Sequence, residues 1–155
     1  MAVKNIEYRR PTPEDCAYLD LHLRQADRDE MAAAGVSNTL ESIIRSVENS
    51  DDPMAVFGDG KLALMFGVVE GETEHVCWCL GTDMVDQNKR QFMRESFRVL
   101  SSLQWRYPLM TNFVDVRNTK ALKWLKHVGF EMDGPWPVDS GHNFMQIFLR
   151  GNNHV

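Results

Sequence analysis

The chain has 155 residues, of which 43% are hydrophobic and 25% are charged, and this is the size and balance of one globular domain. The composition excludes a disordered tail and a collagen-like polymer. The net charge is −5 and the basic residues are scattered among acidic ones along the sequence, so we expect no concentrated positive surface and no nucleic acid partner.

Neither a membrane span nor secretion is expected. No apolar run approaches the roughly 20 residues that cross a bilayer, and the first residues lack the apolar stretch of a signal peptide. The three cysteines, Cys16, Cys77 and Cys79, are too few for a disulfide framework and suit a reducing compartment. We therefore expect a cytoplasmic protein with free thiols.

The first fifty residues predict mainly helices. After a short alternating strand at 6–9, Thr12 is a good N-cap and Asp15 can complete a capping box. Ser37 or Asn38 can cap a later helix. The predicted helices cover residues 13–24, 28–34 and 40–47.

An antiparallel meander of three strands is predicted next. The segment Gly58-Asp59-Gly60-Lys61 has glycines where a hairpin turn needs positive φ, and 71–74 makes a second turn. The predicted strands cover residues 54–57, 62–69 and 75–80.

The longest periodic stretch predicts an amphipathic helix at 86–106. Phe92, Leu100 and Leu103 lie on its apolar face, and we expect them to pack on the sheet with Trp78 and Val114.

The end of the chain alternates strands with a helix. The predicted elements are a strand at 109–116, a helix at 119–128 that Gly129 ends, and strands near 131 and at 144–149. Because a helix between strands usually makes a parallel crossover, we expect one α/β domain over 1–155. It should have a central mixed sheet with helices on both faces, in the order β-α-α-α-β-β-β-α-β-α-β-β.

A family resemblance rests on the segment Val116-Arg117-Asn118-Thr119-Lys120-Ala121-Leu122-Lys123-Trp124-Leu125-Lys126-His127-Val128-Gly129-Phe130. It resembles the segment of the GNAT acetyltransferases that leads from the fifth strand into the next helix, with its Asn, its Ala three residues later and its closing Gly-Phe. The start Tyr8-Arg9-Arg10-Pro11-Thr12-Pro13-Glu14-Asp15 is also similar to many GNAT chains. The resemblance implies a GNAT-like fold.

Within that superfamily, the second half of the chain is most similar to short, divergent GNAT-like proteins of tailed bacteriophages, including an internal virion protein of short-tailed phages. The residues that carry this similarity are Cys77-Trp78, Thr82-Asp83, Lys89-Arg90-Gln91-Phe92 and 118–129. The similarity implies a protein that acts in the host cytoplasm or is packaged in the virion, with other phage or host proteins as partners.

The resemblance also implies acetyl-CoA as the cofactor. GNAT enzymes hold its pyrophosphate on the backbone of a loop with two closely spaced glycines, but no glycine pair occurs in 81–92, and Asp83 and Asp86 would repel phosphate. Lys89 and Arg90 could pair with phosphate, although their pattern also suits the solvated face of an amphipathic helix. Lys89, Arg90 and Asn118 are therefore the candidate cofactor-binding residues. We expect acetyl-CoA binding to be weak or lost.

No catalytic residue can be assigned from the sequence. In many GNAT enzymes a Tyr seven residues after the Asn is the acid that protonates the leaving thiolate, and counting from Asn118 leads to Leu125. Trp124 has only an indole donor and cannot replace a Tyr hydroxyl.

His75, Cys77 and Cys79 alternate along one predicted strand and therefore share a face. No further Cys or His pair at zinc-like spacing completes a set of four ligands, so we expect core packing and no metal.

Two functions remain open. The chain is either a non-catalytic GNAT-fold phage protein for binding or assembly, or an active acetyl-CoA-dependent N-acetyltransferase that modifies a host protein or a small amine. The missing glycine pair and the missing Tyr favour the first.

Overall fold

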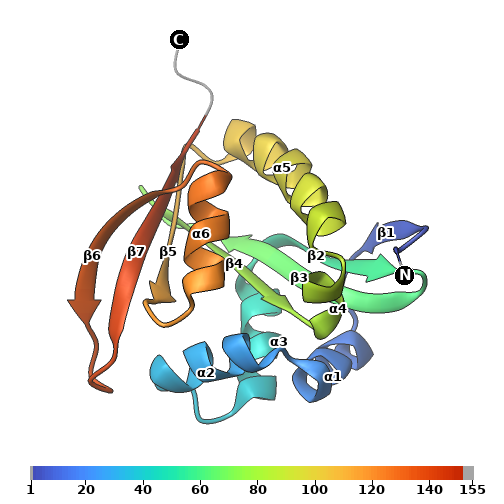
Figure 1. Ribbon diagram of the computed structural model, residues 1–155, viewed down its shortest axis with the longest axis horizontal. Helices are drawn as coiled ribbons and strands as arrows, with labels where there is room; N and C mark the ends of the chain where they lie inside the picture. Colours follow the sequence, from blue (N-terminus) through green and yellow to red (C-terminus); the bar gives the residue numbers. More distant parts are fainter. Residues whose placement is uncertain (1, 152–155) are drawn as a thin grey trace.

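The computed structural model describes residues 2–151, which form a seven-stranded sheet in the order β1-β2-β3-β4-β5-β7-β6 (Figure 1). Of the neighbouring pairs only β4 and β5 run parallel. The elements are β1 (Ile6–Arg9), α1 (Pro13–His22), α2 (Gln25–Ala33), α3 (Thr39–Asn49), β2 (Asp51–Gly58), β3 (Lys61–Val69), β4 (His75–Gly81), α4 (Asp83–Gln87), α5 (Lys89–Arg106), β5 (Leu109–Asp115), α6 (Thr119–His127), β6 (Glu131–Pro137) and β7 (Asn143–Arg150). This mixed sheet confirms the predicted fold class.

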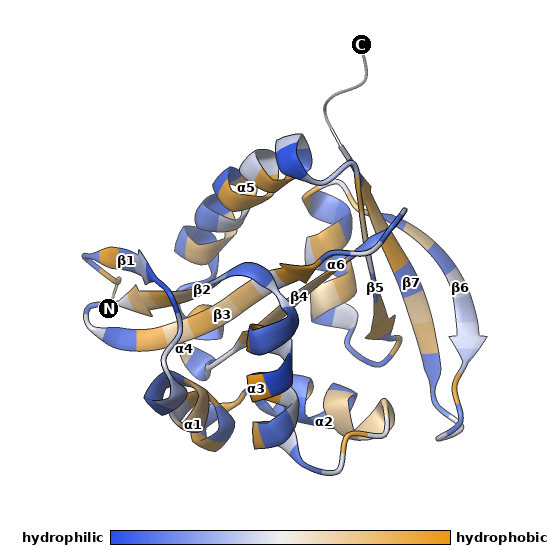
Figure 2. Cartoon of the chain, turned by 180° about the vertical axis from the view of Figure 1, so that it is seen from behind, coloured by the Kyte–Doolittle hydropathy of each residue, from blue (hydrophilic) through white to orange (hydrophobic). Residues whose placement is uncertain are grey.

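The helices form two layers, one on each face of the sheet. Helices α1 and α3 pack on the first strands through a cluster that includes Leu19, Ile43 and Met65, all fully buried. On the opposite face, α5 and α6 pack through a second cluster that includes Met110 and Leu125. The two views in Figures 1 and 2 show these layers from opposite sides.

Local signals place the ends of several helices. The Thr12 hydroxyl accepts a hydrogen bond from the Asp15 N–H, and the Asp15 carboxylate accepts one from the Thr12 N–H, which confirms the predicted capping box of α1. Asn38, rather than Ser37, caps α3. Helix α2 begins at Gln25, three residues earlier than predicted.

The matched segment folds as its residues predict. The Asn118 side chain accepts a hydrogen bond from the Ala121 N–H at 3.3 Å and caps α6. Gly129 follows α6 with φ of +109°, a conformation that favours glycine because it has no Cβ.

The predicted helix at 86–106 is wrong as one unit. The backbone of Asn88 has φ of −128° and ψ of 45°, outside the helical region, and it divides the stretch into α4 and α5. The Asn88 side chain donates a hydrogen bond to the Met84 carbonyl, which stabilises this break. The sequence signal for helix was correct on both sides of the break, but an extra short helix stands before α5.

The predicted partnership of Trp78 with α5 is also wrong. Leu100 and Leu103 pack in the cluster of Val114 as expected, whereas Phe92 packs in a third cluster with Val56 and Ala63. Trp78 lies on the opposite face of the sheet with the α1 and α3 cluster, where its indole donates to the Ser50 hydroxyl at 2.6 Å. Side chains alternate along β4, so the neighbour Cys77 faces the α5 and α6 layer and Trp78 cannot.

Within residues 2–151, no helix has both the length and the apolar character needed to cross a bilayer.

Candidate functional site

The parallel strands β4 and β5 stay together over only two residue pairs. His75 pairs with Met110 and Val76 with Thr111. Farther along, the Asn112 side-chain amide donates a 2.6 Å hydrogen bond to the Cys77 carbonyl in place of a backbone pair. We call the space between 77–81 of β4 and 112–115 of β5 the strand gap.

Helix α2 bridges the far end of the strand gap. The Asp27 carboxylate accepts a 2.8 Å hydrogen bond from the Gly81 N–H of β4, and the Glu30 carboxylate accepts a 2.6 Å hydrogen bond from the Asp115 N–H of β5. The two acids are one helical turn apart and so share a face of α2. Each therefore satisfies a backbone donor that no neighbouring strand reaches.

Asp27 is also half of a buried ion pair. Its carboxylate lies 3.0 Å from the Arg24 guanidinium, and Arg24 reaches Asp86 of α4 at 3.4 Å. The Arg24 N–H donates to the Gly81 carbonyl, so this residue and Asp27 occupy both backbone groups of Gly81. The start of α2 is thereby fixed against the end of β4.

Glu30 is a much weaker acid than an ordinary glutamate. Burial raises its pKa to about 7, and the hydrogen bond from the Asp115 N–H only partly opposes this shift. The nearby Asp27 and Asp115 carboxylates raise it further. A carboxyl group that titrates near neutral pH can both accept and return a proton, which is what a general base requires.

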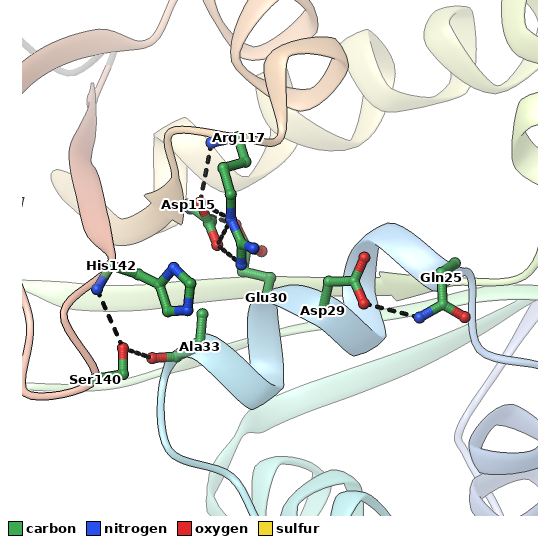
Figure 3. A network of polar contacts seen from close by, with 8 residues as sticks. All are labelled: Gln25, Asp29, Glu30, Ala33, Asp115, Arg117, Ser140 and His142. Carbon is green, nitrogen blue, oxygen red and sulfur yellow. Dashed lines mark hydrogen bonds and ion pairs between the residues drawn. The ribbon is translucent and has the colours of Figure 1, made fainter.

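A second pair of charges lies beside Glu30 (Figure 3). Arg117 donates from its Nε and Nη2 to the buried Asp115 carboxylate, and these hydrogen bonds lower the pKa of Asp115. A pocket of about 210 Å³ opens here between α2 and the turn before β7. It is lined by Asp29, Ala32, Ala33, Arg117 and His142.

A larger pocket, of about 410 Å³, lies between α5 and strands β1 to β3. At its rim Tyr8 donates to Glu95 at 2.6 Å and Tyr107 donates to Asp51 at 2.7 Å. Its lining residues do not include the strand gap or any of the candidate cofactor residues Lys89, Arg90 and Asn118.

The expectation of core packing holds for two of the three alternating residues of β4 and is wrong for the third. His75 is buried against the Tyr107 ring, with centroids 5.1 Å apart, and Cys77 is largely covered. Cys79 is exposed, because β5 has already diverged at its level and no longer covers it. Among the described residues, no group of three His, Cys, Asp or Glu side chains could hold a metal ion.

At the end of β4, two backbone donors are already hydrogen-bonded within the protein. The Gly81 N–H is bonded to Asp27 and the Thr82 N–H to the Ala63 carbonyl, so neither is available to a phosphate. The first turn of α4 presents Asp83 and Asp86, whose charges oppose an anion. At these two positions the backbone donors are therefore already paired, and the nearest side chains of α4 are acidic.

The three candidate cofactor residues lie at the starts of two different helices. Lys89 and Arg90 are exposed in the first turn of α5, whereas Asn118 caps α6. Leu125, which stands where the resemblance places a proton donor, is only 8% exposed and packs in the second cluster.

The acidic residues of α2 were missed by sequence reasoning. A signal exists in hindsight, since Asp27 and Glu30 have helical spacing and would share one face of a short helix. Nothing in the sequence shows that this face meets the ends of two strands.

Comparison with solved structures identifies the fold. An aminoglycoside N(6′)-acetyltransferase from Legionella pneumophila matches with a TM-score of 0.72 at 11% identity, over 94% of this chain and 91% of that one. A GNAT-family acetyltransferase from Bacillus anthracis matches with a TM-score of 0.69 at 11% identity, over 96% of each chain. PaiA N-acetyltransferase from Thermoplasma acidophilum, solved with coenzyme A, matches with a TM-score of 0.59 at 16% identity, over 92% of this chain and 98% of that one.

No protein-family model matches the chain, and no curated protein matches it in sequence. The likeness is thus one of architecture over nearly the whole length, at identities that carry no information on chemistry. The chain has the fold of the GNAT acetyltransferases.

Proposed function

We propose that this protein uses a GNAT fold to bind other proteins and does not transfer acetyl groups. The observation that carries the proposal is the occupied end of β4, where Asp27 takes the Gly81 N–H and α4 places two acids in the path of a phosphate. Acetyl-CoA binding is accordingly weak or lost.

The buried position of Leu125 supports the same conclusion. A transferase of this kind needs a group that returns a proton to the leaving thiolate, and a leucine within the core has none to give. Loss of a positioned acid typically costs about a hundredfold to ten-thousandfold in rate.

The biological setting that we propose is a tailed bacteriophage. It rests on the similarity of Cys77-Trp78, Lys89-Arg90 and the segment 118–129 to GNAT-like phage proteins. The protein would act as a virion-associated or morphogenesis protein, in the host cytoplasm or packaged in the virion, with phage or host proteins as partners.

One observation favours an alternative function, that of an active N-acetyltransferase acting on a host protein or a small amine. Glu30 has a pKa of about 7 and lies at the strand gap, and the exposed Cys79 shows that the gap is accessible at that level. In this alternative Glu30 removes the proton of the acceptor amine.

Titration with acetyl-CoA, followed by calorimetry and by thermal unfolding, separates the two functions. A ligand at 100 times its dissociation constant adds about 2.7 kcal/mol of stability, and we expect no such increase. Saturable micromolar binding that Lys89→Ala with Arg90→Ala abolishes, while the distant Arg45→Ala does not, would contradict the proposal. Acceptor-dependent release of CoA that Glu30→Gln abolishes would establish the enzyme instead.

A further inference from the structure

Charge is strongly segregated between the helices of one layer and the rest of the chain. Helices α5 and α6 together carry eight Lys and Arg residues and one Glu, whereas the remainder carries nine Lys and Arg and twenty-one Asp and Glu. The expectation that no concentrated positive surface exists is therefore wrong. The cations are scattered along the sequence, but the fold places α5 and α6 in the same layer (Figure 1).

The cations of these helices are exposed to solvent. On α5, Arg90, Arg94 and Arg98 follow one another at four-residue intervals and are all exposed. On α6, Lys120, Lys123 and Lys126 are exposed at three-residue intervals. We call these six residues the basic face. Of the six, Arg98 alone pairs with an acid among the described residues, Glu95 at 2.8 Å.

Two exposed aromatic side chains lie on α5 with the arginines of the basic face. Phe97 is 41% exposed and its ring meets the edge of His127 on α6, with centroids 5.8 Å apart, so it lies where the two helices adjoin. Trp105 is 66% exposed and lies on the outward side of α5, two turns beyond Phe97. Exposed rings of this size among cations provide flat apolar surfaces next to positive charge.

We infer that the basic face binds single-stranded nucleic acid. Lys and Arg neutralise backbone phosphates, while exposed aromatic rings stack on bases, and this combination is how proteins hold single strands without reading their sequence. A duplex hides the faces of its bases and would leave Phe97 and Trp105 without a partner.

An acidic protein or a second copy of this chain fits the basic face less well. Protein interfaces are enriched in Arg and aromatic residues, but they are depleted in Lys, and half of the basic face is Lys. The net charge of −5 does not oppose the inference, because charges farther away than a Debye length of about 10 Å are largely screened. The inference concerns the outer surface of two helices and does not depend on whether acetyl transfer is lost.

Fluorescence anisotropy tests the inference with a labelled oligothymidine of about 20 nucleotides, longer than the roughly 4–16 nucleotides of known single-strand sites. A mixed-sequence duplex of equal length is the comparison. We expect the single strand to bind more tightly, with an affinity that falls between about 50 and 200 mM salt. If all six cations meet phosphates, the logarithmic slope is about −4.

Variants separate the two parts of the site. Lys120→Ala, Lys123→Ala and Lys126→Ala together should reduce the size of the slope by about 2. Trp105→Ala should weaken binding roughly fivefold to a hundredfold at fixed salt and leave the slope unchanged. Trp136→Ala on β6, also an exposed Trp, and Arg45→Ala on α3 are matched controls that should bind like the parent.

Three results would overturn the inference. The first is no binding at the lowest salt, and the second is equal binding of the duplex with no effect of Trp105→Ala. The third is sedimentation that shows salt-sensitive oligomers, which the triple lysine variant disperses and the oligothymidine does not, since the basic face would then bind a second copy of the chain.

Discussion

Asp27 and Glu30, one turn apart on α2, each hold the backbone N–H of a different strand, Gly81 of β4 and Asp115 of β5. The helix thus supplies, through side chains, the connection that the sheet lacks where these strands part. Because the acceptors are carboxylates, the connection depends on charge and on pH, which no ordinary ladder of backbone hydrogen bonds does.

Glu30→Gln should change how stability depends on pH. In the folded protein the pKa of Glu30 is raised from about 4.5 to about 7, so the folded state binds the carboxyl proton more tightly than the unfolded state does. The stability that this bound proton confers is lost as pH rises from about 4.5 to 7. The parent should therefore lose roughly 2–3 kcal/mol of unfolding free energy over this range relative to Glu30→Gln. Urea unfolding at pH 5 and pH 8 measures the difference, and parallel curves for the two proteins would contradict the assigned pKa.

Asp27→Ala should destabilise the protein by roughly 3 kcal/mol, because it leaves the Gly81 N–H without an acceptor and removes the closer of the two carboxylates that pair with the partly buried Arg24. Glu41→Ala is the matched control, since it breaks an exposed pair with Arg45 that is worth about 0.3–0.5 kcal/mol. Denaturant unfolding compares the two variants. Equal losses would mean that the Asp27 contacts are not formed in solution.

Asn118→Ala should cost about 1 kcal/mol through loss of the cap on α6. Thr119→Ala, at the exposed first position of the same helix, should cost much less. Thermal unfolding of both variants checks this. If Asn118→Ala melted like Thr119→Ala, then the side chain would not be acting as a cap.

Leu125→Ala should destabilise the protein by about 2–5 kcal/mol, since it opens a cavity between α6 and the sheet. Leu21→Ala on α1 is the control, because Leu21 is 77% exposed and its loss should change stability by less than about 0.5 kcal/mol. Chemical unfolding of the two alanine variants provides the measurement. A small loss for Leu125→Ala would place this residue at the surface and reopen the question of a group that acts there.

The parts of the fold that the sequence predicts correctly are those set by neighbouring residues. The capping box of Thr12 and Asp15 and the cap at Asn118 each involve residues three positions apart, and Gly129 has positive φ for reasons within its own backbone. Hydrophobic periodicity likewise predicts most of the strands and helices, because it too depends on residues that are close together in the sequence.

The candidate site could not be predicted in this way, because its contacts join distant segments. Asp27 and Gly81 are 54 positions apart, and Glu30 and Asp115 are 85 apart. The basic face has the same origin, since α5 and α6 are separated by the whole of β5 and meet only once the sheet has formed. A count of charges along the chain therefore missed it.

The brief contact of β4 with β5 has a mechanical consequence. With two residue pairs in register, the line between these strands is the weakest seam of the sheet, and it separates a block of four strands from a block of three. Any strain between the two blocks concentrates along this line. At the end where β4 and β5 have separated, the Asp27 and Glu30 carboxylates of α2 connect the two strands, and the strength of this connection depends on their protonation. Hydrogen exchange at the Gly81 and Asp115 amides therefore reports each opening of the molecule between β4 and β5.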